Sequence, residues 1–302
     1  MFSLWGWGMK PLRKAVLPVA GLGTRVLPAT KSIPKEMLPV VDRPAVQYVV
    51  DEAREAGIEH IVFVTGRAKS AIEDYFDRAF ELETILQGKG KQDVLQALTD
   101  ALPEPGSMSF VRQQAPLGLG HAIWCARDII GDEPFAVLLP DVLIQGRPGC
   151  LSQMVSAYNE TGGNIIAVDE VPREDVSKYG VIDPKDTVGQ LIEMRGMVEK
   201  PSVDDAPSNL KITGRYILQP EILNLLENQQ SGAGGEIQLT DAMARLMQTQ
   251  PFYALPYEGV DFDCGDRLGY LRAITHYALT HEDLGERARA MFKEALNSKA
   301  PA

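Results

Sequence analysis

The sequence predicts an α/β fold built on a three-layer, doubly wound, mostly parallel mixed sheet of the Rossmann-like type. The order of apolar and amphipathic segments along the chain leads to this fold class. Apolar runs of strand length alternate with longer amphipathic segments from one end of the chain to the other. This alternation implies right-handed β-α-β crossovers, which place helices on both faces of a sheet whose strands run mainly in one direction.

Six apolar runs are expected to be strands, and helical patterns fall between them. The strands are residues 15–20, 61–65, 108–111, 135–139, 164–168 and 211–218. The clearest helix covers residues 44–56, where Pro44 stands at the start and Gly57 just past the end. Further helices are expected over residues 68–87, 119–130, 149–160, 220–229, 237–249 and most of 266–297.

Composition and charge exclude several classes of protein. The 302 residues are 45% hydrophobic and 24% charged, which is ordinary for a soluble globular protein. A net charge of −11 argues against nucleic acid as the main partner. No apolar run reaches the roughly 18 residues that a membrane-spanning helix needs. The N-terminus lacks the order of an export signal, and Cys125, Cys150 and Cys264 form no CxxC pair, so we expect a cytoplasmic protein.

Positive charge is concentrated at the start of the chain, where residues 1–35 contain six Lys or Arg and no acid. Within this segment, Gly21 and Gly23 follow the first strand in the sequence AGLGTR. Glycines at such a place let backbone N–H groups approach phosphate oxygens closely. A long, irregular loop that also carries Arg25, Lys31 and Lys35 suits a polyphosphate better than a plain turn would.

Two familiar phosphate-binding motifs do not fit this loop. A dinucleotide-binding loop has a third glycine and leads at once into a helix, whereas Pro28, Pro34 and Pro39 prevent a long helix here. A Walker A loop ends in Gly-Lys-Ser/Thr, but in this sequence Lys31 follows a threonine. The loop therefore belongs to neither class.

Seven motifs in order give the chain a resemblance to a known family. GLGTRVLPATKSIPKEMLPV resembles the signature of the sugar-1-phosphate nucleotidyltransferases, and its continuation VDRPAVQYVVDEA is similar to the bacterial UTP–glucose-1-phosphate uridylyltransferases. The later motifs are VRQQAPLGLGHA, SKYGVID, GMVEKP, TGRY, GGEIQLTDA and FDCGDRLGYL. The resemblance runs from about Lys14 to about Thr280, and it implies the nucleotide-diphospho-sugar transferase fold.

The resemblance implies the condensation of UTP and glucose 1-phosphate to UDP-glucose and pyrophosphate, with Mg²⁺ as cofactor. The attacking phosphate loses its second proton near pH 6, so the reaction needs no general base. It needs cations that hold two polyanions together. The implied organisation is a single catalytic domain over residues 10–297, with a nucleotide half (about 10–145), a sugar-phosphate half (about 146–265) and C-terminal helices (about 266–297). Residues 1–9 are expected to be a flexible extension, and the protein a homo-oligomer (dimer or tetramer), as is common in the family.

The family motifs assign roles to individual residues. The predicted catalytic residues are Arg25, Lys35, Asp141 and Lys200. The predicted nucleotide contacts are Ala20, Gly21, Gly23, Thr24, Arg25, Glu36, Gln113 and Gly118. The predicted sugar-phosphate contacts are Tyr179, Gly180, Glu199, Lys200 and Gly214.

The remaining polar residues of the motifs receive a metal-binding or a structural role. Asp141 and Asp263 follow extended segments, and two carboxylates at strand ends can bind one Mg²⁺ while phosphates and waters complete its octahedron. For Glu36 two roles stay open, a bond to the base or the positioning of Lys35. His121 is expected to be structural, and GGEIQLTDA receives no catalytic role.

Three alternatives stay open at the level of sequence. The first is thymidylyl or cytidylyl transfer, or transfer to a different hexose phosphate. The second is an NAD-type dehydrogenase, which the missing third glycine disfavours. The third is a non-catalytic protein that senses sugar nucleotides. Nucleotide assays, NAD(H) binding and pyrophosphate release distinguish them.

Overall fold

The computed structural model describes residues 9–228, 230, 232 and 235–297. Residues 1–8, most of the segment expected to be an N-terminal extension, lie outside the described residues. So does Gly234 of the GGEIQLTDA motif.

The main sheet is mixed and has the strand order β5-β4-β1-β6-β11-β8-β12-β10-β9. Its first half is parallel because β1, β4, β5 and β6 pair in one direction. In its second half β11 and β10 run opposite to their neighbours. The strands are β1 (Lys14–Pro18), β4 (His60–Thr65), β5 (Met108–Arg112), β6 (Phe135–Leu138), β8 (Asn164–Glu170), β9 (Gly180–Val188), β10 (Leu191–Glu199), β11 (Leu210–Leu218) and β12 (Phe252–Pro256).

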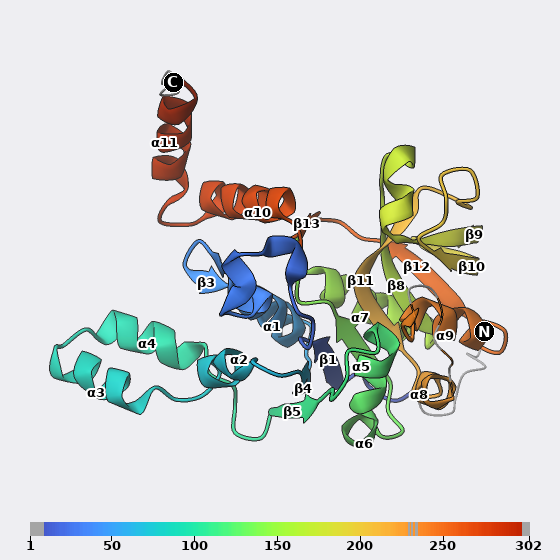
Figure 1. Ribbon diagram of the computed structural model, residues 1–302, viewed down its shortest axis with the longest axis horizontal. Helices are drawn as coiled ribbons and strands as arrows, with labels where there is room; N and C mark the ends of the chain where they lie inside the picture. The colour runs from blue at the N-terminus through green and yellow to red at the C-terminus, as the bar shows by residue number, and fades with distance from the viewer. Residues whose placement is uncertain (1–8, 229, 231, 233–234, 298–302) are drawn as a thin grey trace, which may run out of the picture.

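Helices cover both faces of this sheet, which gives the three layers that the sequence predicts (Figure 1). Strand β1 shows why both faces are covered. Ala15 and Leu17 pack into the core on one face, and Val16 packs into the core on the other. Helices α1 (Ala45–Glu55) and α7 (Cys150–Thr161) pack into the first core. Helices α5 (Leu119–Cys125), α6 (Arg127–Ile130), α8 (Ile222–Glu227) and α9 (Leu239–Leu246) pack into the second.

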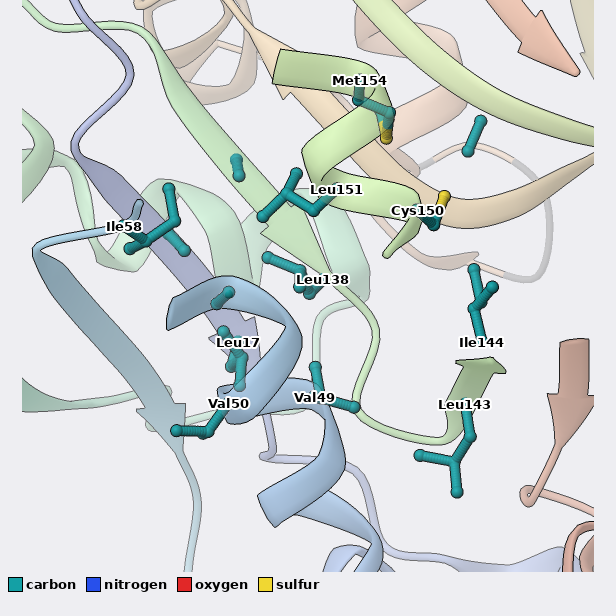
Figure 2. Close-up of a cluster of buried hydrophobic side chains, with 14 of the residues drawn as sticks. Leu17, Val49, Val50, Ile58, Leu138, Leu143, Ile144, Cys150, Leu151 and Met154 are labelled. Atoms are coloured by element: carbon teal, nitrogen blue, oxygen red, sulfur yellow. The ribbon is translucent and has the colours of Figure 1, made fainter. Parts of the chain in front are cut away.

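The first core shows how helical periodicity builds the fold. Figure 2 shows Val49 and Val50 of α1 beside Leu17 of β1 and Leu138 of β6, with α7 covering the same region. All four of these side chains are fully buried. Burying one such aliphatic side chain stabilises the fold by about 1.5–3 kcal/mol. Helix α1 begins after Pro44 and ends before Gly57, as its sequence predicts.

Two small antiparallel ribbons lie outside the main sheet. Strands β2 (Pro39–Val40) and β3 (Arg43–Pro44) form one ribbon, just before α1. Strands β7 (Val142–Gln145) and β13 (Val260–Asp263) form the other. The second ribbon joins two segments that are more than a hundred residues apart in the sequence, and each of them carries a predicted metal ligand.

Several elements differ from the sequence-based expectation. The segment 68–87 is two helices, α2 (Ser70–Tyr75) and α3 (Phe80–Gly88), and it breaks where the Asp77 carboxylate accepts the backbone N–H of Arg78. Helix α4 (Gln92–Asp100) and strands β2, β3, β7, β9, β10 and β12 were not expected, and the extended segment expected before Asp263 is β13. In β9 the run of Asp, Pro, Lys and Asp at 183–186 hides the alternation that marks a strand.

Two helical segments extend away from the sheet, α3–α4 and α10–α11 (Figure 1). Helices α10 (Arg267–Thr280) and α11 (Gly285–Asn297) occupy the expected C-terminal helical region. Over the described ranges, no helix combines the length and the apolar character needed to cross a membrane.

Candidate functional site

The glycine-rich loop folds into three short 3-10 turns (Thr24–Val26, Ala29–Lys31 and Lys35–Met37), in agreement with the prediction that no long helix forms there. Gly23 has a φ of 65°, which favours glycine, and a Cβ at this position would lie 3.2 Å from Cβ of Lys35. The Thr30 hydroxyl donates to the Gly23 carbonyl at 2.7 Å. The loop therefore curls back on itself and brings Lys35 beside its own glycines.

The ribbon β7–β13 brings together Asp141 and Asp263, the two predicted metal ligands. Asp141 directly precedes β7, Asp263 ends β13, and the Cys264 N–H donates to the Asp141 carbonyl at 2.7 Å. The two predicted phosphate-binding cations reach the same place. Nζ of Lys35 lies 2.5 Å from Oδ2 of Asp141, and Arg25 lies 3.7 Å from Asp141 and 3.5 Å from Asp263.

The charges of this cluster perturb one another. Burial would raise the pKa of Asp141, but the Lys35 ammonium and the Arg25 guanidinium outweigh it and hold that pKa below its usual range. Burial and the Asp141 carboxylate raise the pKa of Asp263, against the effect of Arg25. Burial opposes the charge of Lys35, yet Asp141 and Glu36 raise its pKa. Two carboxylates that repel each other therefore face two cations at one position.

The donor set of this cluster fits Mg²⁺. A Cβ on Gly265 would lie 2.7 Å from Oδ1 of Asp263 and 2.9 Å from Oδ2 of Asp141, so the two carboxylates converge on one small space. Among the described residues, no group of three or more His, Cys, Asp or Glu could hold a metal ion. Mg²⁺ is commonly bound by one or two carboxylates together with substrate phosphates and waters, which is what Asp141 and Asp263 offer.

The predicted base-reading residues lie together beyond β5. The Gln113 N–H donates to the Thr65 carbonyl, and the Gln113 side-chain nitrogen lies 3.1 Å from the Gly118 carbonyl and 3.0 Å from Nδ1 of His121. Gly118 has a φ of 106°, and a Cβ there would lie 2.8 Å from the Ile237 carbonyl. A side chain at Gly118 is therefore excluded twice, by its backbone conformation and by its neighbour.

The other predicted nucleotide contacts lie at the loop end of β1 or just after it. Ala20 is half-buried, and a Cβ on Gly66 would lie 3.1 Å from its carbonyl. Gly21 and Thr24 are exposed. The Glu36 carboxylate is buried and accepts a hydrogen bond from Lys69 at 2.7 Å, so its direct cationic partner is Lys69 and not Lys35.

The predicted sugar-phosphate residues meet at the end of β10. Glu199 pairs with Gly180 across the β9–β10 ribbon, and the Lys200 N–H donates to the Tyr179 carbonyl at 3.0 Å. Lys200 has a φ of 46°, an uncommon conformation for a residue with a side chain and one that often marks functional sites. Its ammonium lies 3.7 Å from Oε1 of Glu199, and its side chain is exposed.

Gly214, a predicted sugar-phosphate contact, packs against the segment that leads to Asp141. It has a φ of 83°, and a Cβ there would lie 2.8 Å from Cδ1 of Leu139. The Leu139 N–H donates to the Gly214 carbonyl at 2.9 Å. Since Leu139 is two residues before Asp141, glycine at position 214 lets β11 pack closely against the segment that carries this predicted metal ligand.

Four residues support the site through contacts that the sequence did not predict. Arg215 is fully buried, forms an ion pair with Glu52 and donates to the carbonyls of Leu139 and Val142. Thr240 donates to Glu199. The other two are Lys69, which pairs with Glu36, and Gly265, described above. Arg215 and Thr240 lie inside the motifs TGRY and GGEIQLTDA, so the motifs themselves were the available signal.

Comparison with known proteins identifies the family. Residues 14–280 match the nucleotidyl transferase family. A UTP–glucose-1-phosphate uridylyltransferase of Komagataeibacter xylinus is 52% identical over 86% of this chain and 92% of its own length. Among solved structures, UTP-bound UGPase from Acinetobacter baumannii is 52% identical, with a TM-score of 0.87 over 94% of this chain and 99% of that one. A UDP-glucose pyrophosphorylase complexed with UDP-glucose is 43% identical, with a TM-score of 0.79 over 88% and 98%. The chain therefore belongs to the nucleotidyl transferase family, in the branch of the UTP–glucose-1-phosphate uridylyltransferases.

Proposed function

We propose that this chain joins UTP to α-D-glucose 1-phosphate and releases UDP-glucose and pyrophosphate. The observation that carries the proposal is the convergence of Arg25 and Lys35 on Asp141 and Asp263. Two cations and two carboxylates at the loop end of a parallel sheet suit a triphosphate with its metal. Similarity to proteins named for this reaction, one of them bound to UTP and another to UDP-glucose, favours the same substrates here.

In the proposed reaction an ionised oxygen of the sugar phosphate attacks the α-phosphorus of UTP. A new P–O bond forms there as the bond to the pyrophosphate oxygen breaks, and the pyrophosphate leaves with its electron pair. Arg25 and Lys35 neutralise the triphosphate, and Lys200 holds the attacking phosphate. Loss of one preorganised group of this kind costs about 10²–10³ in rate.

The nucleotide and the sugar take the two ends of the site in this proposal. The base lies against Gln113 and Gly118, and the triphosphate follows the loop that contains Ala20, Gly21, Gly23 and Thr24, with Glu36 beneath it. The glucose lies against Tyr179, Gly180, Glu199 and Gly214. The catalytic unit then spans residues 10–297, with the nucleotide half before the sugar half.

Asp141 and Asp263 would hold Mg²⁺ in this site. When bound, the ion neutralises charge on the phosphates and on the leaving pyrophosphate. We expect Asp141→Asn to abolish Mg²⁺-dependent turnover while the melting temperature stays within a few degrees of the parent. Asp132→Asn is the matched control, because Asp132 is exposed and pairs only with Lys10 in the described part of the chain. Full turnover in Asp141→Asn would contradict the metal assignment.

A nucleotide assay tests the proposed substrates. Pyrophosphate release is measured with glucose 1-phosphate and each of UTP, dTTP, CTP and GTP, with and without EDTA. We expect the highest kcat/KM with UTP and no release in EDTA. A clear preference for another nucleotide would move the chain to the thymidylyl or cytidylyl class, and no release with any of them would revive the sensor alternative.

We further propose a homo-oligomer in a reducing compartment such as the cytoplasm. Helices α10 and α11 and the connection between them expose large apolar side chains, as expected of a surface that pairs with another subunit: Leu268, Leu271, Leu284, Met291 and Leu296. Cys125, Cys150 and Cys264 are free thiols. Light scattering that reports a monomer at micromolar concentration would contradict the oligomer.

A further inference from the structure

The side-chain amide of Gln113 points its nitrogen at two neighbours. Nε2 lies 3.1 Å from the backbone carbonyl of Gly118 and 3.0 Å from Nδ1 of His121. A backbone carbonyl can only accept a hydrogen bond, so the atom that faces Gly118 has to be the amide nitrogen. The orientation of the Gln113 amide is therefore set by its surroundings, and the residue is 9% exposed.

The second hydrogen of the same nitrogen defines the state of His121. For Nδ1 to accept it, the imidazole has to be neutral and carry its proton on Nε2. Burial lowers the pKa of His121, which favours the neutral ring near pH 7. Both hydrogens of the Gln113 amide are then used, and Oε1 has no partner among the residues that the structure describes. Oε1 is left as a fixed acceptor.

A fixed acceptor distinguishes the pyrimidine bases. Uracil carries a donor, N3–H, between two carbonyl groups, and thymine presents the same three groups. Cytosine has an unprotonated N3 that can only accept, so an oxygen aimed at this position repels it. Two acceptors that face each other, or a polar group without a partner, weaken the binding of cytosine relative to uracil by about ten-fold or more.

We propose that His121 is a specificity-determining positioning residue, which locks the Gln113 amide so that Oε1 selects uracil over cytosine. The proposal rests on the proposed function, in which the base of UTP lies against Gln113 and Gly118. His121 touches Gln113 and not the nucleotide. Its position in helix α5, one turn after Gly118, places Nδ1 beside the amide.

His121 is needed because the Gly118 carbonyl alone holds only one of the two amide hydrogens. Without Nδ1 the other hydrogen has no partner. A flip of the Gln113 amide, which exchanges Oε1 and Nε2, then costs less free energy than in the parent protein. The turned amide presents a donor, which pairs with N3 of cytosine. Loss of His121 should therefore lower kcat/KM for UTP and raise kcat/KM for CTP. A general loss of packing does not produce this pattern.

Three variants test the proposal. His121→Ala removes the acceptor, and His121→Asn keeps one, because Oδ1 of asparagine takes a position close to that of Nδ1. The control is His60→Ala. The His60 side chain bonds only to Ser109 in the described ranges, at 2.9 Å, and His60 begins β4, at the opposite end of the strand from Thr65 and Gln113. The readouts are kcat/KM for UTP, dTTP and CTP, and the dissociation constants of UMP and CMP from calorimetry.

We expect the UTP-to-CTP ratio of kcat/KM to fall about ten-fold in His121→Ala. His121→Asn and His60→Ala should keep the parent ratio, and dTTP should change in parallel with UTP. An unchanged ratio in His121→Ala, or an equal loss for UTP and CTP, would overturn the proposal and leave His121 a packing residue. Absence of UTP turnover in the parent protein would contradict the proposed function instead, and the UMP-to-CMP binding ratio would still decide the role of His121.

Discussion

Thr240 donates its hydroxyl to the carboxylate of Glu199 at 2.8 Å, and this bond joins α9 to the proposed sugar side of the site. Thr240 belongs to the motif GGEIQLTDA, whose described part also contacts the proposed base side. The Ile237 N–H donates to the Leu117 carbonyl, and the Ile237 carbonyl accepts the Gly120 N–H. One short segment thus supports both the turn at Gly118 and the carboxylate at Glu199.

Thr240→Val is expected to weaken the handling of glucose 1-phosphate. Valine keeps the shape of threonine but leaves Glu199 free to turn, so KM for glucose 1-phosphate should rise about ten-fold while KM for UTP stays unchanged. Thr240→Ser restores the hydroxyl and should restore KM. Steady-state kinetics with each substrate varied measures the effect.

The control for this prediction is Thr84→Val, on the surface helix α3, where the hydroxyl bonds only to the Phe80 carbonyl among the described residues. It should leave both KM values unchanged. A rise in KM for UTP as large as that for glucose 1-phosphate in Thr240→Val would show that the segment acts on the whole site and not through Glu199.

Arg215→Met is expected to unfold the protein more easily and to slow catalysis. Arg215 is buried, pairs with Glu52, and donates to the carbonyls of Leu139 and Val142 on either side of Asp141. Its removal leaves a buried carboxylate without its cation, which costs about 3–5 kcal/mol in the free energy of unfolding. It also frees the segment that holds Asp141, so kcat should fall in conditions where the variant is still folded.

Urea denaturation and kinetics well below the melting temperature measure the two effects. Arg13→Met is the control, because Arg13 forms an exposed pair with Glu59 and should change the free energy of unfolding by no more than about 0.5 kcal/mol. Equal stability of Arg215→Met and the parent would mean that the buried pair contributes nothing net.

The inner strands of the parallel half could be predicted because they are apolar runs buried on both faces. Strands β1, β4 and β6 are such runs. The hairpin β9–β10 could not, since it carries polar residues on both faces and its ladder contains register shifts. The helix expected over 119–130 is divided into α5 and α6 at Ala126, which has a φ of −90° and a ψ of 0°.

The candidate site could be predicted only where a residue offers its chemistry directly. Arg25, Lys35 and Asp141 do so, and the structure brings them together. The supporting residues act through contacts that join distant parts of the chain. Arg215 reaches Glu52 across 163 positions, and no local pattern reveals such a pair. The same holds for Lys69 and Glu36.

Gly265→Ala is expected to lower kcat about 10²-fold or more, because it places a methyl group in the centre of the charge cluster. A Cβ there would lie 2.5 Å from Nη2 of Arg25 and within 3 Å of both Asp141 and Asp263. These groups have to move apart, which disturbs the space proposed for the metal. Titration of Mg²⁺ against activity measures the change, and a higher Mg²⁺ requirement should accompany it.

Gly88→Ala is the matched control for Gly265→Ala, because a Cβ at position 88 meets no described atom within 4 Å. It should leave both kcat and the Mg²⁺ requirement unchanged. Parent-like activity in Gly265→Ala would show that the cluster tolerates displacement, and the tight geometry would then be irrelevant to turnover.

Lys200→Ala is expected to impair glucose 1-phosphate far more than UTP. The Lys200 backbone has a φ of 46°, its N–H donates to the Tyr179 carbonyl, and its exposed ammonium lies beside Glu199. That ammonium is the cation proposed for the attacking phosphate, so kcat/KM for glucose 1-phosphate should fall about 10²–10³-fold. The dissociation constant of UTP, measured by calorimetry without the sugar, should change less than about two-fold, because single rim charges contribute little to binding at a distance.

Lys178→Ala, which removes an exposed lysine paired with Asp175, should change neither value. Comparable damage to both substrates would place Lys200 at the triphosphate instead, and the division of the site into a nucleotide end and a sugar end would have to be redrawn.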